Sequence, residues 1–377
     1  MLNFKIKSVF KTFSRLVHST IAATALFGCG LNNEEKGPDA PSQPQPAITL
    51  QLEPRSHPEF HARMSWSADE TEFRNYARPQ YAGIFWRGDF ERLEIIAEVY
   101  RQGGADARTG SGLFKQLFFY QTFRGHEFIN ANDIKPEAQE LLARWAEAYP
   151  SSPAPHIAKA KMLYSIVEAN NFGLDAPNQR ANYLKHVETA QKQLSKIWPL
   201  IAEESEAHNH RLLLTLKSPE IRNNWRPIYE EAREKAPGYY QLYFNILWFA
   251  PRKPGTKSAL TLLDEISDDL VEDTPNENMA GYARAYWAAS QLNSNMFALM
   301  RKRLVKSELF RAGFYDVLES YPDIWNANAF AFYSCALGDH ETFKNVMSAI
   351  DGNLIDDIWD ARTQQGCIEW ANNSPPA

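Results

Sequence analysis

The chain has 377 residues, of which 44% are hydrophobic and 23% charged, and its formal net charge is -6. This is the composition of an ordinary globular protein, and it excludes a wholly disordered chain, a collagen-like repeat and a multi-span membrane protein. Three cysteines are too few for a disulfide-dense scaffold. A pI near 5.9 argues against a dedicated nucleic-acid-binding protein, which normally has a basic domain.

Residues 1–28 have the features of a bacterial export signal. Basic residues precede a mostly apolar stretch at 16–28, which is too short to span a bilayer core of about 30 Å. The stretch ends in Leu26-Phe27-Gly28-Cys29, which resembles the lipobox of bacterial lipoproteins. The resemblance implies cleavage before Cys29 and attachment of acyl chains such as palmitate to this residue. The alternatives are a chance cysteine near an ordinary cleavage site and an uncleaved amphipathic leader.

The expected lipid anchor is followed by a polar tether over 29–47, rich in Pro, Asn, Glu and Gln, which is typical of a disordered spacer. The chain is therefore predicted to face the periplasm, attached to the membrane through its N-terminal lipid. Gly30 is not the aspartate that retains lipoproteins at the inner membrane of enteric bacteria, so the outer membrane is favoured. Cleavage removes four of 40 basic residues and no acids, leaving 36 against 46 and a net charge of -10. Such a body as a whole is attracted neither to anionic lipid nor to nucleic acid.

Cys335 and Cys367 are the two remaining cysteines, an even number for an oxidising compartment. Their separation of 32 residues allows an antiparallel hairpin and one further segment to bring them together. A disulfide and two separate buried thiols are the alternatives.

The body, expected to be one domain over 48–377, has mainly helical periodicity, and only Ile48 to Leu52 alternates like a strand. Helices joined by Pro, Gly and Asn predict an all-α array of antiparallel helical hairpins. The predicted helical runs are 90–100, 138–149, 157–169, 181–197, 228–235, 239–249, 260–271, 282–292, 296–304 and 343–350.

Two local patterns resemble tetratricopeptide hairpins. In Gly88-Asp89-Phe90-Glu91 and Gly338-Asp339-His340-Glu341, the glycine can end one helix and the aspartate can cap the next. The second pattern, in which an apolar helix end is followed by a proline, resembles the second helix of the repeat. The resemblance implies a right-handed stack of hairpins. The prolines of the second pattern, 87 and 85 residues apart, are Pro150, Pro237 and Pro322.

The body also resembles, over about residues 85–370, an uncharacterised bacterial family of helical-repeat proteins that is known only as a domain of unknown function. The family carries no established catalytic residues, so the resemblance implies architecture alone. The segments that carry it are Gly88 to Glu91, Pro237-Gly238-Tyr239-Tyr240 with Tyr243, Pro251-Arg252, Tyr282 to Trp287, and Asn328 to Asp339.

No catalytic or phosphate-binding motif is present in the sequence, and no cofactor is predicted. His208 and His210 are two residues apart, so on a helix they point in different directions and are not expected to share a metal. We expect their segment to be a solvated polar helix end. The acidic run from Asp264 to Glu277 could attract calcium or a basic partner, but a solvated helix face is the preferred interpretation.

Aromatic residues cluster in the middle third of the chain. They could line a ligand groove on a concave face, although helical spacing favours core positions for most of them. Arg284 is expected more often to cap a carbonyl or form a buried ion pair than to bind a ligand. The candidate groove residues are Trp225, Tyr239, Tyr240, Tyr243, Tyr282, Arg284, Tyr286 and Trp287.

Two functional hypotheses follow. The first is a lipid-anchored, non-enzymatic interaction or scaffold protein that recognises an unknown protein, peptide or glycan, because repeat arrays bind along an extended face without a single motif. The alternative is a cell-envelope enzyme, such as a glycan-acting hydrolase, whose two carboxylates are brought together by the fold.

Overall fold

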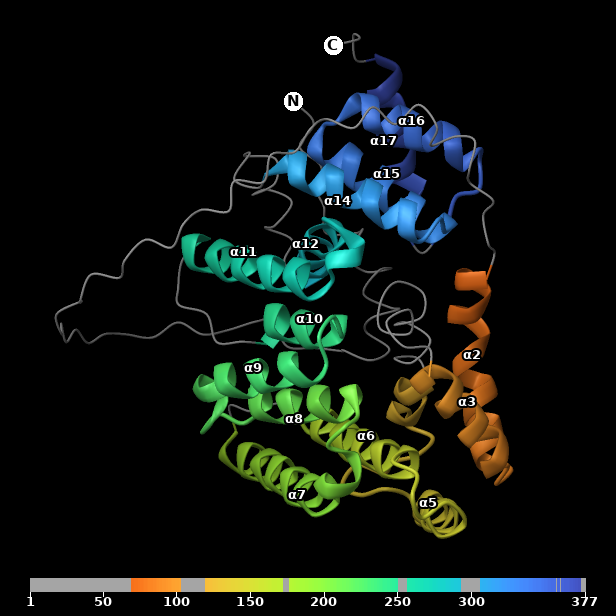
Figure 1. The fold of residues 1–377 in the computed structure, drawn as a ribbon, viewed down its shortest axis with the longest axis vertical. Helices are drawn as coiled ribbons and strands as arrows, with labels where there is room; N and C mark the ends of the chain where they lie inside the picture. Colours follow the sequence, from red (N-terminus) through yellow and green to blue (C-terminus); the bar gives the residue numbers. More distant parts are fainter. Residues whose placement is uncertain are drawn as a thin grey trace, which may run out of the picture.

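The structure is a computed structural model that describes residues 69–102, 119–171, 176–249, 256–292, 306–356, 358–359 and 361–373 (Figure 1). The described chain is all-α, as predicted, with an isolated β-bridge between Ile129 and Ile134. The strand-like segment 48–52, the signal, the tether with Cys29 and the helical run 296–304 lie outside the described residues.

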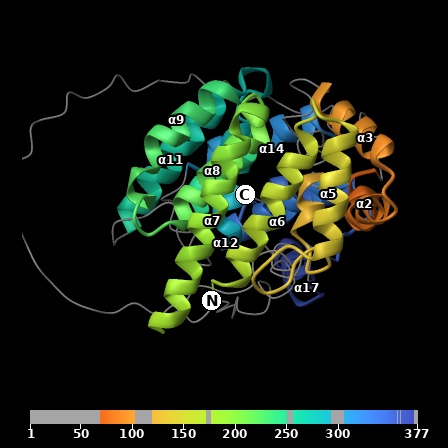
Figure 2. The same cartoon turned by 90° about the horizontal axis from the view of Figure 1, so that it is seen from below.

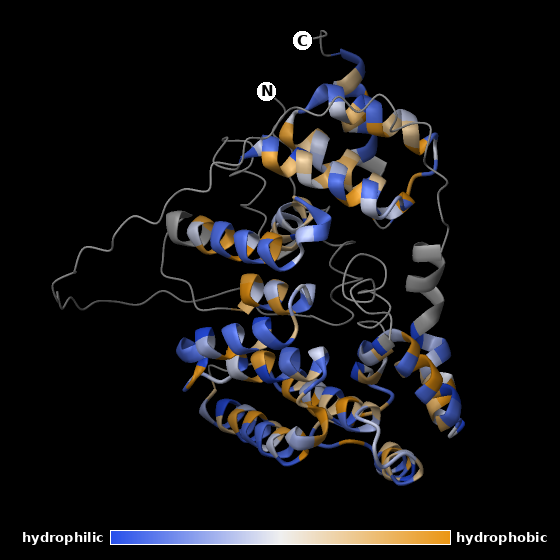
Figure 3. Ribbon diagram, viewed as in Figure 1, coloured by the Kyte–Doolittle hydropathy of each residue, from blue (hydrophilic) through white to orange (hydrophobic). Residues whose placement is uncertain are grey.

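Most of the described helices carry polar and apolar residues on different faces (Figure 3). No helix in the described ranges is both long and apolar enough to cross a membrane. In chain order they are α2 (Asp69–Trp86), α3 (Phe90–Gln102), η2 (Thr122–Arg124), α5 (Pro136–Ala148), α6 (Ala154–Ala169), α7 (Pro177–Ile201), α8 (Ser205–Lys217), η3 (Arg222–Asn224), α9 (Trp225–Lys235), α10 (Tyr240–Phe249), α11 (Thr256–Asp273), η4 (Pro275–Glu277), α12 (Ala280–Leu292), α14 (Ser307–Ser320), α15 (Ile324–Leu337), α16 (His340–Ile350) and α17 (Ala361–Asn373).

An inner row of helices runs through the molecule. α6, α8, α10 and α12 contact one another in succession. α15 continues the row, because the hydroxyls of Ser290 on α12 and Tyr333 on α15 are hydrogen-bonded at 2.7 Å. The helices α7, α9, α11, α14 and α16 pack against this row, each beside an inner helix (Figures 1 and 2). The elongated arrangement leaves long helices such as α7 with one face toward solvent.

The two predicted glycine–aspartate turns are confirmed. Gly88, between α2 and α3, and Gly338, after α15, have positive φ angles of 69° and 77°. Asp89 accepts a hydrogen bond from the N–H of Arg92 at 3.3 Å, and Asp339 accepts one from Thr342 at 3.2 Å. Glycine adopts this left-handed conformation without steric cost, and the aspartates satisfy N–H groups that have no partner within the helix.

The three proline-terminated helices end alike. The residues before the prolines, Tyr149, Ala236 and Tyr321, have φ angles of -131°, -138° and -137°. The three residues lie outside the helical region because a residue that precedes proline is sterically disfavoured there. The same three residues donate their N–H groups to the carbonyls of Trp145, Ala232 and Val317, respectively. The prolines follow α5, α9 and α14, and each precedes a helix of the inner row.

Two apolar cores lie on either side of α8. One contains buried residues from Tyr81 to Leu214, and the other contains buried residues from Leu212 to Ala371. Leu213 faces the first core and Leu212 the second, so α8 is a wall that both cores share. The polar residues of α8 are consequently enclosed from both directions.

Candidate functional site

The predicted groove residues lie in the interior and do not line an open surface. Trp225 is the most exposed of the eight at 8%. These residues therefore occupy core positions, as their helical spacing indicated, and do not form the ligand groove that the sequence also allowed. The structure distributes them over α9, α10, α12 and the turn before α10. They contribute to the contacts between these helices.

The hydroxyls of four of these tyrosines donate hydrogen bonds to carboxylates on neighbouring elements. Burial raises the pKa of each of these tyrosines, and the adjacent carboxylates contribute in the same direction, so the hydroxyls keep their protons and act as donors. The donor–acceptor pairs are Tyr239 with Glu206, Tyr240 with Glu277, Tyr243 with Asp273 and Tyr286 with Asp264.

Arg284 is held by aromatic rings. Its guanidinium lies 5.1 Å from the centre of the Tyr240 ring and 5.4 Å from that of Tyr321, and the residue is 2% exposed. Its Nε and Nη2 atoms have no hydrogen-bond partner. The hydroxyls of Tyr240 and Tyr321 donate hydrogen bonds to the Glu277 carboxylate, and the bond from Tyr321 is 2.9 Å long. Cation–π contacts therefore stabilise Arg284, and its Nε and Nη2 atoms form neither the carbonyl cap nor the ion pair that the sequence suggested with any described residue.

A buried ion pair joins α6 to α8 within the first core. Lys161 pairs with Glu206, and both side chains are buried. The Glu206 carboxylate also accepts hydrogen bonds from Tyr239 and, at 3.2 Å, from Asn209. Asn209 in turn accepts a bond of 2.5 Å from Asn245 on α10. Burial lowers the pKa of Lys161, and the Glu206 charge opposes that effect. This network ties three successive helices of the inner row together.

A second ion pair lies beside the first. Arg124, the last residue of the short helix η2, pairs with Glu168 at the end of α6, and its guanidinium lies 5.2 Å from the centre of the Tyr164 ring. The Tyr164 ring also contacts His210, whose ring centre is 5.4 Å away. Burial lowers the pKa of His210 well below its ordinary value, and the charges of Lys161 and Arg124 add to this effect.

The expectation of a solvated helix end around His208 and His210 is wrong. Both histidines are buried, as are Glu206 and Asn209, because α8 is enclosed by the two cores. His208 Nε2 is hydrogen-bonded to the carbonyl of Ala202 at 2.7 Å, while His210 contacts Tyr164. In the described residues, no group of three His, Cys, Asp or Glu side chains is placed to hold a metal ion.

The acidic run on α11 is also not simply a solvated face. Arg233 on α9 pairs with Asp269 at 2.5 Å and with Asp273 at 2.6 Å, and Tyr229 donates to Asp269 at 3.0 Å. Arg226 on α9 pairs with Glu265, which lies one turn before Asp269 on α11. The predicted electrostatic contact is therefore largely made within the chain. These ion pairs join α9 to α11, which are separated in the sequence by α10.

A groove with a volume of about 390 Å³ opens between α7, α8 and α9. Ile221, in the connection between α8 and α9, is 41% exposed there. On the other side, the Arg211 guanidinium lies 5.1 Å from the centre of the Trp198 ring and pairs with Glu231 at 2.6 Å. The lining side chains are Gln191, Leu194, Ser195, Trp198, Arg211, Leu214, Thr215, Ile221 and Ile228.

The groove was not visible in the sequence. Its residues come from three helices and one connection, and their spacing within each helix is the ordinary spacing of an amphipathic helix. An exposed Ile221 among the polar residues that follow α8 is the one local signal that could have drawn attention to the site. The groove exists only because these elements pack against one another, and the sequence of each element alone does not show that packing.

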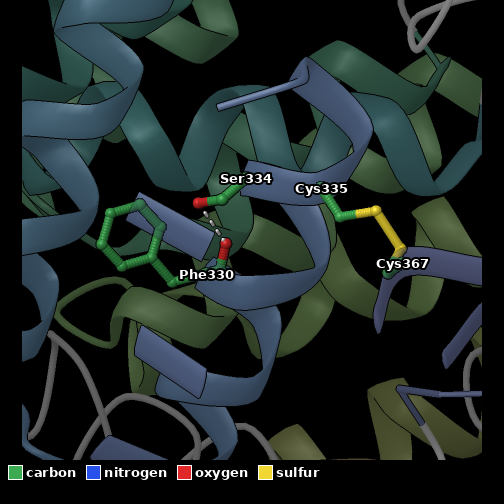
Figure 4. Close-up of a disulfide and its surroundings, with 4 residues drawn as sticks. All are labelled: Phe330, Ser334, Cys335 and Cys367. Carbon is green, nitrogen blue, oxygen red and sulfur yellow. Dashed lines mark hydrogen bonds between the residues drawn. A yellow bond between two sulfur atoms is a disulfide. The ribbon is translucent and has the colours of Figure 1, made fainter. Parts of the chain in front are cut away.

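Cys335 on α15 and Cys367 on α17 form a disulfide, with their Cα atoms 5.9 Å apart (Figure 4). Beside it, the Ser334 hydroxyl donates to the carbonyl of Phe330 at 2.8 Å. The bridge joins the last described helix to the inner row. The expected lipid-attachment residue, Cys29, lies outside the described residues.

Comparison of the chain with models of protein families, with curated proteins and with solved structures finds no match. The geometry of the chain's own residues is therefore the basis for a functional proposal.

Proposed function

We propose that this protein is a lipid-anchored cell-envelope protein that acts as a non-enzymatic interaction module, with the groove between α7, α8 and α9 as its recognition site. The export signal, the lipobox at Cys29 and the polar tether support the anchor. The observation that carries the recognition site is an open groove of about 390 Å³ with an apolar floor and an arginine at its side.

The chemistry of the groove favours a peptide segment with apolar side chains. Leu194 and Leu214 form the buried base of the groove, and the exposed Ile221 with the partly exposed Trp198 and Ile228 supplies the apolar surface that a partner's aliphatic or aromatic side chain could cover. Covering such surface is favourable by about 25 cal/mol per Å² of apolar area. A glycan would leave much of this floor without a matching group. We therefore favour a peptide partner over a glycan.

Arg211 adds a preference for an acidic residue in the partner. The Trp198 ring holds the guanidinium, and its present carboxylate partner, Glu231, is 44% exposed. An exposed ion pair of this kind contributes about 0 to 1 kcal/mol, so a partner's carboxylate can replace Glu231 at little cost. An apolar segment with one well-placed Asp or Glu is the ligand that the groove fits.

The buried carboxylates support structural roles in place of hydrolysis. Glu206 is occupied by Lys161 and Tyr239, and Glu277 by Tyr240 and Tyr321. A hydrolase needs two carboxyl groups that both reach the substrate. The alternative of a glycan-acting enzyme stays a prediction.

A photo-crosslinking amino acid at Ser195 tests the groove in cells that produce the full-length protein. Ser195 is exposed and lines the groove, so we expect a discrete crosslinked adduct whose yield falls strongly when Ile221→Glu replaces an exposed apolar side chain of the groove with a charge. A crosslinker at Glu272, an exposed residue of α11, is the matched control. Absence of an adduct from position 195, or the same adduct from position 272, would argue against the groove. Unchanged thermal unfolding of Ile221→Glu shows that the fold is kept.

A further inference from the structure

Charge is distributed unevenly over the helices. The chain has a formal net charge of -6, yet α7 has a net charge of +3, from Arg180, Lys185, Lys192 and Lys196 against Glu188. This is the most positive charge of any α-helix in the described ranges. At the other extreme, α11 has one basic residue and six acidic ones. A negatively charged surface repels the molecule as a whole, but it would attract the α7 side of the molecule.

The lysines of α7 lie on one face of the helix. Lys185, Lys192 and Lys196 are separated by seven and four residues, which is the spacing of one helix face. All three are exposed, as is Arg180 near the start of the helix. The opposite face of α7 packs into the first core through Tyr183, Val187, Ala190, Leu194 and Ile201. Figures 1 and 2 show α7 at the periphery of the molecule.

An apolar residue continues this face toward the end of the helix. Leu200 follows Lys196 by four residues and is 53% exposed, so it lies one turn further along the same face. Glu188 is the one acid on the face and pairs with Lys192 at 2.7 Å. The face, defined as Lys185, Lys192, Lys196 and Leu200, combines cationic ends with an exposed aliphatic side chain. The lysines can attract anionic headgroups, and an exposed leucine beside them can be buried at the headgroup boundary.

We propose that this α7 face lies against the anionic phospholipid surface to which the chain is tethered. The proposal rests on the lipid anchor of the proposed function. Each basic residue near an anionic membrane contributes about 1 kcal/mol of attraction, which falls off within a Debye length of about 10 Å. A flexible tether of about 17 residues has a root-mean-square length of roughly 23 Å, so the body is kept near the surface at a high effective concentration. A weak attraction is then enough to orient the body.

The charge of the remaining surface favours the same orientation. Figure 1 shows α7 at one end of the outer helices and the acidic α11 farther along, with α9 between them, so an orientation that turns α7 toward the lipid headgroups keeps α11 at a distance from them. Leu200 can enter the headgroup region, where its exposed apolar surface is removed from water. The membrane and not a nucleic acid is the fitting polyanion, because the tether brings only the membrane close.

Lysine labelling of the lipidated protein in vesicles tests this orientation. One set of vesicles contains about one third phosphatidylglycerol in phosphatidylcholine, and the other contains phosphatidylcholine alone. With the anionic vesicles, acetylation of Lys185, Lys192 and Lys196 should slow by about threefold or more, because the surface attraction keeps the face docked. About 0.5 M salt should abolish the difference by screening. The exposed Lys235 and Lys344 should react equally in both sets.

A charge-reversal variant and a flotation step separate the two proposals. Lys192→Glu/Lys196→Glu should lose the protection of Lys185, whereas the matched control Lys235→Glu/Lys344→Glu should keep it. A protein that floats with the vesicles but shows equal labelling of Lys185 in both sets overturns the α7 face and leaves the anchor intact. Acetylation of Lys185 that is slowed equally by vesicles of phosphatidylcholine alone also overturns the α7 proposal. A protein that does not float with either set contradicts the anchor, and the α7 proposal with it.

Discussion

The ammonium group of Lys161 and the carboxylate of Glu206 form an ion pair between α6 and α8, and their side chains are 1% and 0% exposed. Removing two charges from water is costly, so such a pair persists only where further hydrogen bonds satisfy it. Tyr239, in the turn before α10, and Asn209 on α8 supply those bonds. The pair therefore specifies how three helices of the inner row meet.

Removing one member of this pair should be strongly destabilising. Lys161→Met leaves the Glu206 charge buried without its counter-ion, and we expect the free energy of unfolding to fall by about 3 to 5 kcal/mol. The double variant Lys161→Met/Glu206→Gln should lose less than the sum of the two single variants, because the second change removes the uncompensated charge. Urea unfolding of the four proteins measures this coupling. Simple additivity would show that the pair does not act as a unit.

Stability should decrease as the pH falls below 6.5. Burial, reinforced by Lys161 and Arg124, lowers the pKa of His210 well below 6.5, with the carbonyl of Ala160 opposing it. Below pH 6.5 the unfolded chain therefore binds a proton that the folded chain does not, and the free energy of unfolding falls by up to about 1.4 kcal/mol per pH unit. His208, whose pKa is also lowered by burial, adds to the slope. Unfolding measured between about pH 5 and 7 should show a shallower slope in His210→Gln; an identical slope would contradict the assignment.

The contacts of α11 should depend far more on Arg233 than on Arg226. Arg233 bonds to Asp269 and Asp273 while mostly buried, so Arg233→Met should cost about 1 to 3 kcal/mol of unfolding free energy. Arg226 forms one pair at the surface with Glu265, and Arg226→Met is the matched control with an expected cost of about 0 to 1 kcal/mol. Chemical denaturation compares the two variants. Equal losses would mean that burial does not distinguish the two pairs.

The disulfide should stabilise the C-terminal helices. Cys335 and Cys367 close a loop with a sequence separation of 32, for which chain entropy gives about 3 to 4 kcal/mol. Cys335→Ser/Cys367→Ser should lose about this amount, and reduction of the native protein should have the same effect. Alkylation of the unreduced, unfolded protein followed by mass spectrometry counts the free thiols. Two labelled thiols at these positions would remove the bridge.

Local signals in the sequence predicted much of the fold. The turns at Gly88 and Gly338 depend on a glycine conformation and an aspartate cap, both encoded by adjacent residues, and they were confirmed. The end of α9 before Pro237 is local for the same reason, because proline restricts the residue before it. Such features do not depend on which helices later pack together.

Features that require two helices to meet were not predicted. His208 and His210 were expected in solvent, but two cores enclose α8. Lys161 follows Ile157 by four residues and so lies on the buried stripe of α6, a signal that could have indicated a buried ion pair. Its partner Glu206 had no comparable signal, because only the packing of α8 against α6 brings the two together. The groove beside Trp198 was missed for the same reason.

The lipid anchor at Cys29 is tested most directly by mass spectrometry of the protein purified from membranes of cells that express the full chain. The N-terminal peptide should begin at Cys29 and carry a diacylglyceryl group on its thiol, with further acylation of its amino terminus. Cys29→Ser, as a control, should prevent lipid attachment, so the folded body should no longer be anchored in the membrane. An N-terminal peptide that begins at Met1, or that contains an unmodified Cys29, would contradict the proposed anchor.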